Sequence, residues 1–579
     1  MKFIVGLFIF LSAVINATAQ VSNRPPTFCN PLDLPYRFQL DGSQREAADP
    51  VIVLYKNYYW LFASKSGGYW KSEDMVSWKL IEPLGLPLEQ YAPAVAVYKD
   101  KLYFLAGDGV FTTDDPDKGI WNKVATLPYG VSDPALFVDD DGRIYLYHGC
   151  NENKPIQVVE LDTVTFQPKG KSIPIAYPDM PHRGWEVAGD NNSGKKTNDT
   201  SFKNFLPWIE GSWMNKINGK YYLQYAAPGT QFKSYGDGVF VSNTPTGRFV
   251  YASYSPFSFK PQGFVTGVGH SATFLDINKN YWHVTTVALS VRHIFERRLA
   301  LFPVFIAANG QLQSNTYLGD YPQLAPHFLH KGAINNLAGW MLLSYNKPAT
   351  ASSTLISSNN QNFNIVNAFD ENIATWWSAS SGNKGEWLQV DLTKVCRVDA
   401  IQINFADQAA EVFGRLRNDG YKYIIEVSKN AVDWNIIVDR RDSARDEPHH
   451  YIQLDSSVKA RYIRITNYHS PANSFFSLYD FRIFGSALGK NPEGVTSVKA
   501  KRNSTDFRKV HLSWKPVANA DFYIVRYGIG KNRLWNNYQV YRSTELNINS
   551  LNANTAYYFT VDAVNASGIT KGKIIVMIK

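Results

Sequence analysis

The sequence predicts an all-β protein, a five-bladed β-propeller followed by two β-sandwiches. The first observation is a repeat of a small or acidic residue, a short apolar strand, a tight turn and an aromatic strand, which occurs five times between residues 49 and 287. The second is that residues 344–579 hold short half-buried strands and no helix of note, which favours β-sandwiches. The third is an aromatic content of 14%, since β-sheets favour aromatic side chains.

Each repeat has the form of a β-hairpin that begins one blade. Asn, Asp or Gly stands at every turn, and these residues favour the tight turns of hairpins. The equivalent positions Asp49, Ala92, Asp133, Glu210 and His270 stand 43, 41, 77 and 60 residues apart, and the longest interval contains the polar insertion GDNNSGKKTNDTS. Repeats of this size, with about four short strands each, are typical of a β-propeller. They are DPVIVLYKNYYWLFAS from Asp49, APAVAVYKDKLYFLAG from Ala92, DPALFVDDDGRIYLYHG from Asp133, EGSWMNKINGKYYLQYAAPG from Glu210 and GHSATFLDINKNYWHVTTV from Gly269.

The first strand of each blade lines the central channel of a propeller, so the five starting positions should converge at one end of it. Those positions are Asp49, Ala92, Asp133, Glu210 and His270. Two like charges about 5 Å apart repel by roughly 3 kcal/mol at an effective dielectric constant of about 20. Each carboxylate on its own could equally be a turn or cap residue. Three at matching positions cost stability, and this indicates that they serve chemistry.

Two further units follow the propeller. Residues 344–486 contain the strands EWLQVDL, YIIEVSKNAVDWNIIV and ARYIRITNY and should form a β-sandwich. Residues 491–579 place Trp514 on an alternating strand. The segment from Leu551 to Tyr557 fits a tyrosine corner, in which the tyrosine hydroxyl bonds to nearby backbone.

The first 19 residues have the three parts of a signal peptide. Lys2 is the positive start, Phe3 to Ile15 form an apolar stretch, and Ala17-Thr18-Ala19 is a small-residue cleavage site. The stretch is too short to span a bilayer stably, and no later run of roughly 18 apolar residues occurs. We therefore expect an exported protein, secreted or periplasmic, with no membrane span.

Charge and cysteine content narrow the classes of partner. The whole net charge of +9 is located in the segment from Lys490 to the last residue, so residues 1–489 are neutral overall. Nucleic-acid binding would need a basic groove with interleaved aromatic residues, and residues 1–489 show none. The three cysteines, Cys29, Cys150 and Cys396, match no metal-binding spacing and are predicted to be structural thiols.

These motifs resemble known families over nearly the whole chain after the signal peptide. Residues from about 28 to 335 resemble glycoside hydrolase family 43, a family of five-bladed propellers, in REAADP at Asp49, VSDPALFVDDDGRIYLYHG at Asp133 and IEGSWMNKINGKYYLQYA at Glu210. Residues 344–486 look like a discoidin (coagulation factor 5/8 type C) domain, close to the family 32 carbohydrate-binding modules. Residues 491–579 look like a fibronectin type III domain.

The family 43 resemblance implies a role for each carboxylate. Asp49 matches the general base that activates water, and Glu210 matches the general acid that protonates the leaving oxygen. Asp133 matches the third carboxylate, which orients the acid and helps to keep it protonated. An inverting glycosidase needs an acid and a base about 6.5–9.5 Å apart, with room for a water, and opposite sides of a propeller channel can supply that separation.

Other residues receive weaker assignments from the same resemblance. His270 matches a channel histidine that contacts a hydrated calcium in several family members; the alternative is a hydrogen-bonded residue of the axis. Arg297 aligns with an arginine that reaches the bound sugar, although Arg298 next to it could take that position instead. Trp70 is a candidate pocket wall or a core residue. In the insertion, Trp185 and Glu186 either shape the substrate site or lie in a solvated loop.

The discoidin-like domain carries a candidate calcium site. Asp370, Thr375 and Asp480 stand where such domains bind a structural Ca²⁺, and oxygen-rich ligands suit this ion. Phe475 and Phe476 either stack on a galactose-like sugar face or pack within their loop. The fibronectin-like unit is predicted to be a spacer or a docking module.

Together these features predict an exo-acting inverting glycosidase that releases terminal α-L-arabinofuranose from plant-type polysaccharides. A β-xylosidase, a β-galactofuranosidase or a galactan-directed enzyme of the same family are the alternatives within the class. The rival from another class is a non-catalytic glycan-binding propeller, and a retaining sucrose-type propeller hydrolase is a third reading. We expect a monomer that needs no cofactor for its chemistry.

Overall fold

The computed structural model describes residues 24–579 except residues 195–206, 290, 334, 357–360, 413 and 417. The predicted signal peptide, residues 1–19, lies outside the described residues. Nearly all regular structure in the described chain is β, broken only by short 3-10 helices: η1 (Pro116–Lys118), η2 (Gly184–Glu186), η3 (Pro326–Phe328), η4 (Ile365–Phe369) and η5 (Pro471–Asn473). The all-β fold class is confirmed.

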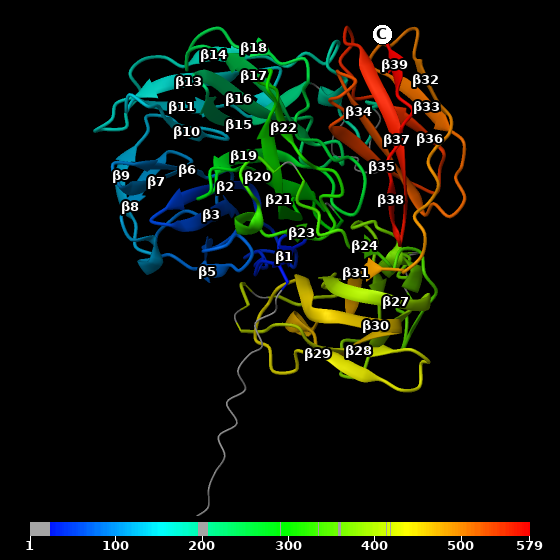
Figure 1. Ribbon diagram of the computed structural model, residues 1–579. Coiled ribbons are helices and arrows are strands. Elements are labelled where there is room, and N and C mark those ends of the chain that lie inside the picture. Colours follow the sequence, from blue (N-terminus) through cyan, green and yellow to red (C-terminus); the bar gives the residue numbers. More distant parts are fainter. Residues whose placement is uncertain are drawn as a thin grey trace, which may run out of the picture.

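Five antiparallel sheets form the blades of a propeller (Figure 1). The first blade holds β2 (Ala48–Tyr55), β3 (Tyr58–Ser64), β4 (Tyr69–Ser72) and β5 (Lys79–Ile81). The second holds β6 (Ala94–Tyr98), β7 (Lys101–Ala106), β8 (Gly109–Thr113) and β9 (Asn122–Thr126). The third holds β10 (Ala135–Val138), β11 (Ile144–His148), β13 (Ile156–Leu161) and β14 (Ile173–Ala176).

The last two blades follow the polar insertion. The fourth holds β15 (Trp208–Ile217), β16 (Lys220–Ala227), β17 (Gly236–Ser242) and β18 (Val250–Tyr251), with the short β12 (Asn151–Glu152) paired to β15. The fifth holds β19 (Gly269–Leu275), β20 (Tyr281–Ala288), β21 (Arg297–Ile306) and β22 (Leu312–Ser314). Strands such as β3 and β21 are buried along most of their length because sheets pack on both faces of each blade.

The turns that join the first two strands of each blade account for the predicted hairpins. Both turn residues have positive φ at Lys56 and Asn57 (50° and 63°) and at Lys99 and Asp100 (46° and 56°). Asn218 and Gly219 repeat the pattern, at 50° and 77°. Two consecutive positive φ angles define the type I′ turn, whose twist matches that of the strands it joins. The tight turns predicted at these positions are confirmed.

The five sheets close into a ring. The first strand of each blade contacts the first strand of the next blade, and β19 contacts β2. The segment before β2 seals the junction between the last blade and the first: Leu32 N donates to Leu299 O of β21 at 2.8 Å. The Asn30 side chain donates to Leu301 O at 3.0 Å and accepts from Leu301 N at 2.9 Å.

The discoidin-like domain is organised around three long strands. These are β27 (Trp387–Phe405), β30 (His449–His469) and β31 (Ser477–Ser486), and β27 pairs with both of the others. Shorter strands complete the sheet system: β24 (Met341–Leu342), β25 (Ala349–Ala351), β26 (Trp377–Ser378), β28 (Lys422–Ser428) and β29 (Asn435–Asp439). Register shifts after Asp391 and Val398 interrupt the pairing of β27 with β30.

The fibronectin-like domain consists of two sheets. One contains β32 (Val498–Arg502), β33 (Val510–Trp514) and β36 (Glu545–Ile548). The other contains β34 (Phe522–Gly528), β35 (Asn536–Tyr541), β37 (Tyr557–Asn565), β38 (Gly568–Thr570) and β39 (Val576–Ile578). Trp514 is buried between them, and Asn552 N donates to the Tyr557 hydroxyl at 3.1 Å. This is the hydroxyl-to-backbone bond that a tyrosine corner requires.

The three domains pack against one another rather than hanging on linkers (Figure 1). A shared apolar cluster contains Cys29 beside the propeller, Phe484 of the discoidin-like domain and Ile524 of the fibronectin-like domain. The pair β1 (Thr27–Phe28) and β23 (Gln323–Leu324) lies outside the blades. The fibronectin-like unit thus packs on the other two domains, and its role as a spacer or a docking module stays a prediction.

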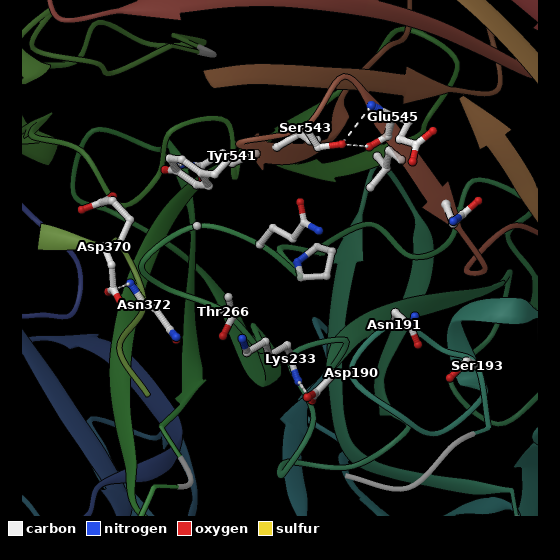
Figure 2. Close-up of a pocket in the computed structure, with 18 residues that line it drawn as sticks. Asp190, Asn191, Ser193, Lys233, Thr266, Asp370, Asn372, Tyr541, Ser543 and Glu545 are labelled. Atoms are coloured by element: carbon white, nitrogen blue, oxygen red, sulfur yellow. Dashed lines mark hydrogen bonds between the residues drawn. The ribbon is translucent and has the colours of Figure 1, made fainter. Parts of the chain in front are cut away.

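A polar cavity of about 780 Å³ remains where the three domains meet. Asp190 and Lys233 of the propeller, Asp370 of the discoidin-like domain and Tyr541 and Glu545 of the fibronectin-like domain all line it (Figure 2). In the described part of the chain, no helix has the length and apolar character needed to cross a membrane.

Candidate active site

A pocket of about 480 Å³ lies where the first strands of the blades begin. Its charged lining consists of Asp49, Asp133, Glu210, His270 and Arg297, together with Glu152. Its aromatic lining consists of Tyr91, Trp208, Phe232 and Phe295. A second cavity of about 350 Å³ is lined by residues further along β2, β6, β10, β15 and β19, within the same channel. The predicted convergence of charged residues at one end of the channel is therefore present.

Left-handed backbone conformations set the direction of the pocket side chains. Asp49, Asp133 and His270 have φ of 52°, 48° and 53°, and Ala92, the uncharged counterpart, has 50°. The pairing registers of β2 and β19 shift just after these residues, as in β-bulges. Such conformations cost about 1–3 kcal/mol for a non-glycine residue and gather at functional sites. The backbone is held in a costly form in order to aim these side chains.

The fourth blade departs from the predicted alignment by one residue. The strained position there is Gly211, with φ of 60°, and not Glu210. Glu210 pairs with Ala226 as Ala48 pairs with Ser64, so it corresponds to the residue before Asp49. A Cβ at position 211 would lie 2.7 Å from the His270 ring, which excludes a side chain there. The acid therefore enters the pocket from the preceding position, and the prediction that Glu210 matches Asp49 and Asp133 is corrected.

This arrangement predicts a large effect of Gly211→Ala. The added methyl group must displace the His270 ring while the backbone keeps a φ that alanine adopts at a cost of about 1–2 kcal/mol. We expect a lower thermal unfolding midpoint and a strong loss of activity. Ala92→Gly is the matched control, because it relieves the same strain in a blade without a charged side chain. It should unfold at an equal or higher temperature, and equal stability of both variants would contradict this account of the backbone.

Asp49 is held as a carboxylate. Ser64 Oγ donates to Asp49 Oδ2 at 2.6 Å, and Arg297 Nη1 donates to Asp49 Oδ1 at 3.1 Å. Thr286 Oγ1 accepts from Asp49 N at 2.8 Å and fixes the backbone. Burial alone would raise the pKa of Asp49, but Arg297 and His270 outweigh it and the pKa lies below its ordinary value. A buried carboxylate that stays ionised suits a group that must accept a proton.

Asp133 and Glu210 are close neighbours. Together with His270 they offer ligand atoms that all lie within 4.8 Å of one another. Gly211 N donates to Asp133 Oδ2 at 3.2 Å. Burial, with the charges of Glu210 and Asp49, raises the pKa of Asp133 to about 7 against the opposing effect of His270. Asp133 therefore titrates near neutral pH, beside the carboxyl group of Glu210.

Three donors surround the Glu210 carboxyl group. Trp208 Nε1 donates to Glu210 Oε2 at 2.6 Å, and Cys150 Sγ donates to the same oxygen at 3.2 Å. The Tyr235 hydroxyl donates to Oε1. Burial raises the pKa of Cys150, so its thiol keeps its proton. The prediction of a structural thiol is correct for Cys29 and Cys396, which are buried, but Cys150 lines the pocket.

Family comparisons identify the domains that carry this geometry. Residues 43–312 match the sequence model of glycosyl hydrolases family 43, residues 348–480 that of the F5/8 type C domain and residues 491–576 that of the fibronectin type III domain. Residues 43–312 therefore form a family 43 glycosyl hydrolase domain. The predicted architecture of a family 43 domain with an F5/8 type C and a fibronectin type III domain is thereby confirmed.

Curated proteins similar to this chain are named for different substrates. It is 26% identical over 285 residues to the beta-D-galactofuranosidase xynD of Aspergillus niger, covering 41% of this chain and 72% of that protein. It is 32% identical over 232 residues to an arabinoxylan arabinofuranohydrolase of Paenibacillus polymyxa (35% and 33% covered). It is 30% identical over 167 residues to a beta-xylosidase of Xylanibacter ruminicola (25% and 47% covered). The chain thus spans less than half the length of the last two.

The solved structures that match the chain include two glycoside hydrolases. One glycoside hydrolase has a TM-score of 0.43 and 18% identity, with 78% of this chain and 99% of that chain covered. A thermostable family-43 glycoside hydrolase has a TM-score of 0.41 and 20% identity, with 52% and 99% covered.

His270 in the family 43 domain bridges two carboxylates. Its Nδ1 lies 3.3 Å from Asp49 Oδ1 and 3.5 Å from Asp133 Oδ2. Burial would lower the pKa of His270, but Asp49, Asp133 and Glu210 raise it above the ordinary value. Asp133, Glu210 and His270 lie close enough together to hold a metal ion, and Ca²⁺ prefers oxygen ligands. Contact of His270 with a hydrated calcium stays a prediction.

Arg297 lies in the pocket as predicted, and Arg298 does not. Arg297 donates to Glu46 Oε1 through Nη2 at 2.6 Å and to Asp49, so it faces the carboxylates from one side. Its direct contact with a sugar remains a prediction. Arg298 points away from the pocket, and its Nε lies 2.9 Å from His449 Nε2 of the F5/8 type C domain.

Three aromatic or acidic candidates lie elsewhere than predicted. Trp70 is fully buried in the core of the first blade, so the prediction that it forms a pocket wall is wrong. Trp185 and Glu186 are neither a substrate rim nor a solvated loop, because both are buried. Tyr225 Oη donates to Glu186 Oε1 at 2.6 Å, and Trp185 Nε1 donates to Tyr251 Oη at 2.9 Å. The sequence around these residues shows no periodic pattern that would distinguish a core side chain from one that lines the pocket.

The predicted calcium ligands of the F5/8 type C domain gather in one region. Thr375 Oγ1 donates to Asp370 Oδ2 at 2.8 Å, and Asp480 Oδ2 accepts from Glu371 N at 3.1 Å. Burial raises the pKa of Asp370 to about 6 and that of Asp480 well above its ordinary value. Crowded carboxylates of this kind fit a Ca²⁺ ion, whose presence stays a prediction. Phe476 is fully buried against Trp377, which excludes it from sugar stacking, and Phe475 is half-buried.

Proposed function

We propose that this family 43 enzyme is an exo-acting, inverting glycosidase that releases terminal α-L-arabinofuranose from plant-type polysaccharides. The observation that carries the proposal is the set of Asp49, Asp133 and Glu210 in one pocket, with Asp49 ionised and the pKa of Asp133 raised to about 7. Relatives named as arabinofuranohydrolases, a xylosidase and a galactofuranosidase support a pentose or furanose as substrate.

The proposed reaction is a single displacement. A water held by Asp49 attacks the anomeric carbon while Asp49 accepts one of the water protons. The bond from the anomeric carbon to the leaving oxygen breaks, and Glu210 gives that oxygen its proton. The electron pair of the broken bond stays on the leaving oxygen. Arg297 and His270 keep Asp49 ionised before the reaction, which makes it ready to act as the base.

Asp133 helps to keep a proton beside the general acid, Glu210. Its carboxyl group is buried beside Glu210, so the two together cannot both be ionised without a large repulsion. Asp133 therefore keeps a proton next to Glu210 up to about neutral pH. Trp208, Tyr235 and Cys150 orient the Glu210 carboxyl group toward the pocket.

Asp133→Asn should move the basic limb of the pH–rate profile to lower pH. The amide removes a negative charge beside Glu210, so the proton on the remaining carboxyl group is lost at a lower pH. The loss of activity on the basic side should therefore begin below the pH of about 7 set by Asp133 in the wild type. Profiles of kcat from pH 4 to 9 measure the effect. An unchanged basic limb would contradict this role of Asp133.

The pocket suits a terminal sugar better than a long chain. It is a hollow of about 480 Å³ with aromatic walls from Tyr91, Trp208, Phe232 and Phe295, the residue type that stacks on sugar faces. Aryl α-L-arabinofuranoside, β-D-xyloside and β-D-galactofuranoside should be tested side by side, followed by release of monosaccharide from arabinoxylan. Highest kcat/KM on arabinofuranoside with monosaccharide as the sole early product is expected. A higher kcat/KM on another glycoside would replace arabinofuranose as the proposed substrate. If none of the three glycosides is hydrolysed, the result would favour a glycan-binding propeller without catalytic activity.

A further inference from the structure

A second cluster of titratable side chains lies outside the pocket, where the segment before the first blade meets the F5/8 type C domain. Asp33, Glu447 and His450 each offer one ligand atom, and these atoms all lie within 4.8 Å of one another. Asp33 belongs to the segment that seals the propeller ring. Glu447 precedes β30, and His450 lies on it. The cluster therefore joins residues more than 400 positions apart in the chain.

Two oxygens of this cluster are buried without partners. Asp33 Oδ2 accepts from Tyr451 N at 3.1 Å, but Asp33 Oδ1 has no hydrogen-bond partner among the described residues. Arg445 pairs with Glu447 Oε1, while Glu447 Oε2 has no partner in the described structure. The Glu447 side chain is only 4% exposed. A buried carboxylate oxygen without a partner costs free energy, so something must satisfy these two atoms.

The histidine is held in place to act as a ligand. A metal-bound histidine is a neutral imidazole that binds through one ring nitrogen, while its other ring nitrogen bonds to a neighbour. The Tyr423 hydroxyl lies 2.5 Å from His450 Nδ1 and fixes the orientation of the ring. Such outer contacts are usual around histidine ligands.

We propose that Asp33, Glu447 and His450 bind one divalent transition-metal cation of the Zn²⁺ class. One imidazole and two carboxylates form a mixed nitrogen and oxygen set, which suits Zn²⁺ better than the oxygen-only preference of Ca²⁺. Tetrahedral Zn²⁺ places its ligand atoms about 3.3–3.5 Å apart, so the cluster closes slightly around the ion. Water completes the coordination.

The ion ties the propeller to the F5/8 type C domain. Next to the cluster, Arg45 makes buried ion pairs with Asp407 at 2.9 Å and with Asp446 at 2.8 Å across the same boundary. Asp33 follows Leu32 in the chain, and Leu32 N donates to Leu299 O of β21. The metal site is therefore next to the hydrogen bond that closes the propeller ring. The metal thus stabilises both the domain interface and the closed propeller.

The test measures Zn²⁺ bound to the full-length protein after treatment with EDTA and removal of the chelator. Mass spectrometry of metals after gel filtration gives the stoichiometry, and thermal unfolding with and without Zn²⁺ gives the effect on stability. Asp33→Asn, Glu447→Gln and His450→Gln should each bind one equivalent of Zn²⁺ less than the wild type. The affinity of the site should fall at least tenfold, because loss of a group that only hydrogen-bonds a ligand already costs about 10–100-fold. Zn²⁺ should raise the unfolding midpoint of the wild type and Ca²⁺ should not do so through this site.

The controls separate this site from others. His469→Gln removes an exposed histidine that pairs with Asp419 in the same domain, and it should bind as the wild type does. Asp33→Asn keeps the size of the side chain and an acceptor for Tyr451 N, so it serves where His450→Gln fails to fold. Equal Zn²⁺ binding by the wild type and a folded cluster variant overturns the proposal, as does a wild type that binds no Zn²⁺ at micromolar concentrations.

Discussion

Glu210→Gln should lower kcat roughly 100- to 10,000-fold on substrates with a poor leaving group, the usual contribution of general acid catalysis. The amide cannot give a proton to the leaving oxygen. It keeps the size of the side chain and still accepts from Trp208 Nε1, so the fold should be unchanged. With a dinitrophenyl glycoside, whose leaving group needs no proton, the loss should be far smaller. Steady-state kcat with both substrates measures the difference.

A matched control distinguishes proton transfer from general disturbance. Glu160→Gln changes an exposed glutamate of the third blade that pairs with Lys169, outside the pocket. It should retain wild-type kcat on both substrates. An equal loss for Glu210→Gln with good and poor leaving groups would show that Glu210 is not the proton donor.

Asp49→Asn should lower kcat by a similar factor of about 100 to 10,000, but with the opposite dependence on substrate. The amide cannot take a proton from the attacking water, so good and poor leaving groups should lose activity equally. It also removes the negative charge that Arg297 and His270 face, which leaves two buried cations without that partner. Thermal unfolding should therefore be measured beside kcat. A loss confined to poor leaving groups would exchange the roles of Asp49 and Glu210.

Local sequence patterns predicted most of the propeller. The turn residues and the alternating first strands are local features, and the hairpin at Lys56 and Asn57 forms as expected. The three carboxylates converge because each begins the first strand of its blade. Their convergence could be predicted without knowing any long-range contact, since blades repeat the same path around one axis.

The one-residue error at Glu210 shows the limit of that argument. Whether residue 210 or residue 211 takes the left-handed conformation depends on the space beside His270, which comes from the next blade. A glycine at position 211 was the only local signal. Trp70 and Trp185 were misplaced for a related reason: a tryptophan in a strand looks the same in the sequence whether it packs under a neighbouring sheet or lines a pocket.

Contacts between domains left no trace in the sequence. Arg45, Arg298 and Asp33 look like ordinary charged residues of loops and strands, yet each meets a partner in the F5/8 type C domain. Cys150 likewise gave no sign that it would reach Glu210, because its neighbour is 60 residues away. Such pairs depend on tertiary packing, and only the folded structure brings them together.

The most direct measurement of the proposed chemistry is the anomer released first from an aryl α-L-arabinofuranoside, followed by ¹H NMR before mutarotation. The arrangement of a base, an acid and a third carboxylate predicts that β-L-arabinose appears first, because water attacks the face opposite the leaving group. First appearance of the α-anomer would show retention through a covalent intermediate and would contradict the assignment of Asp49 as a base that activates water.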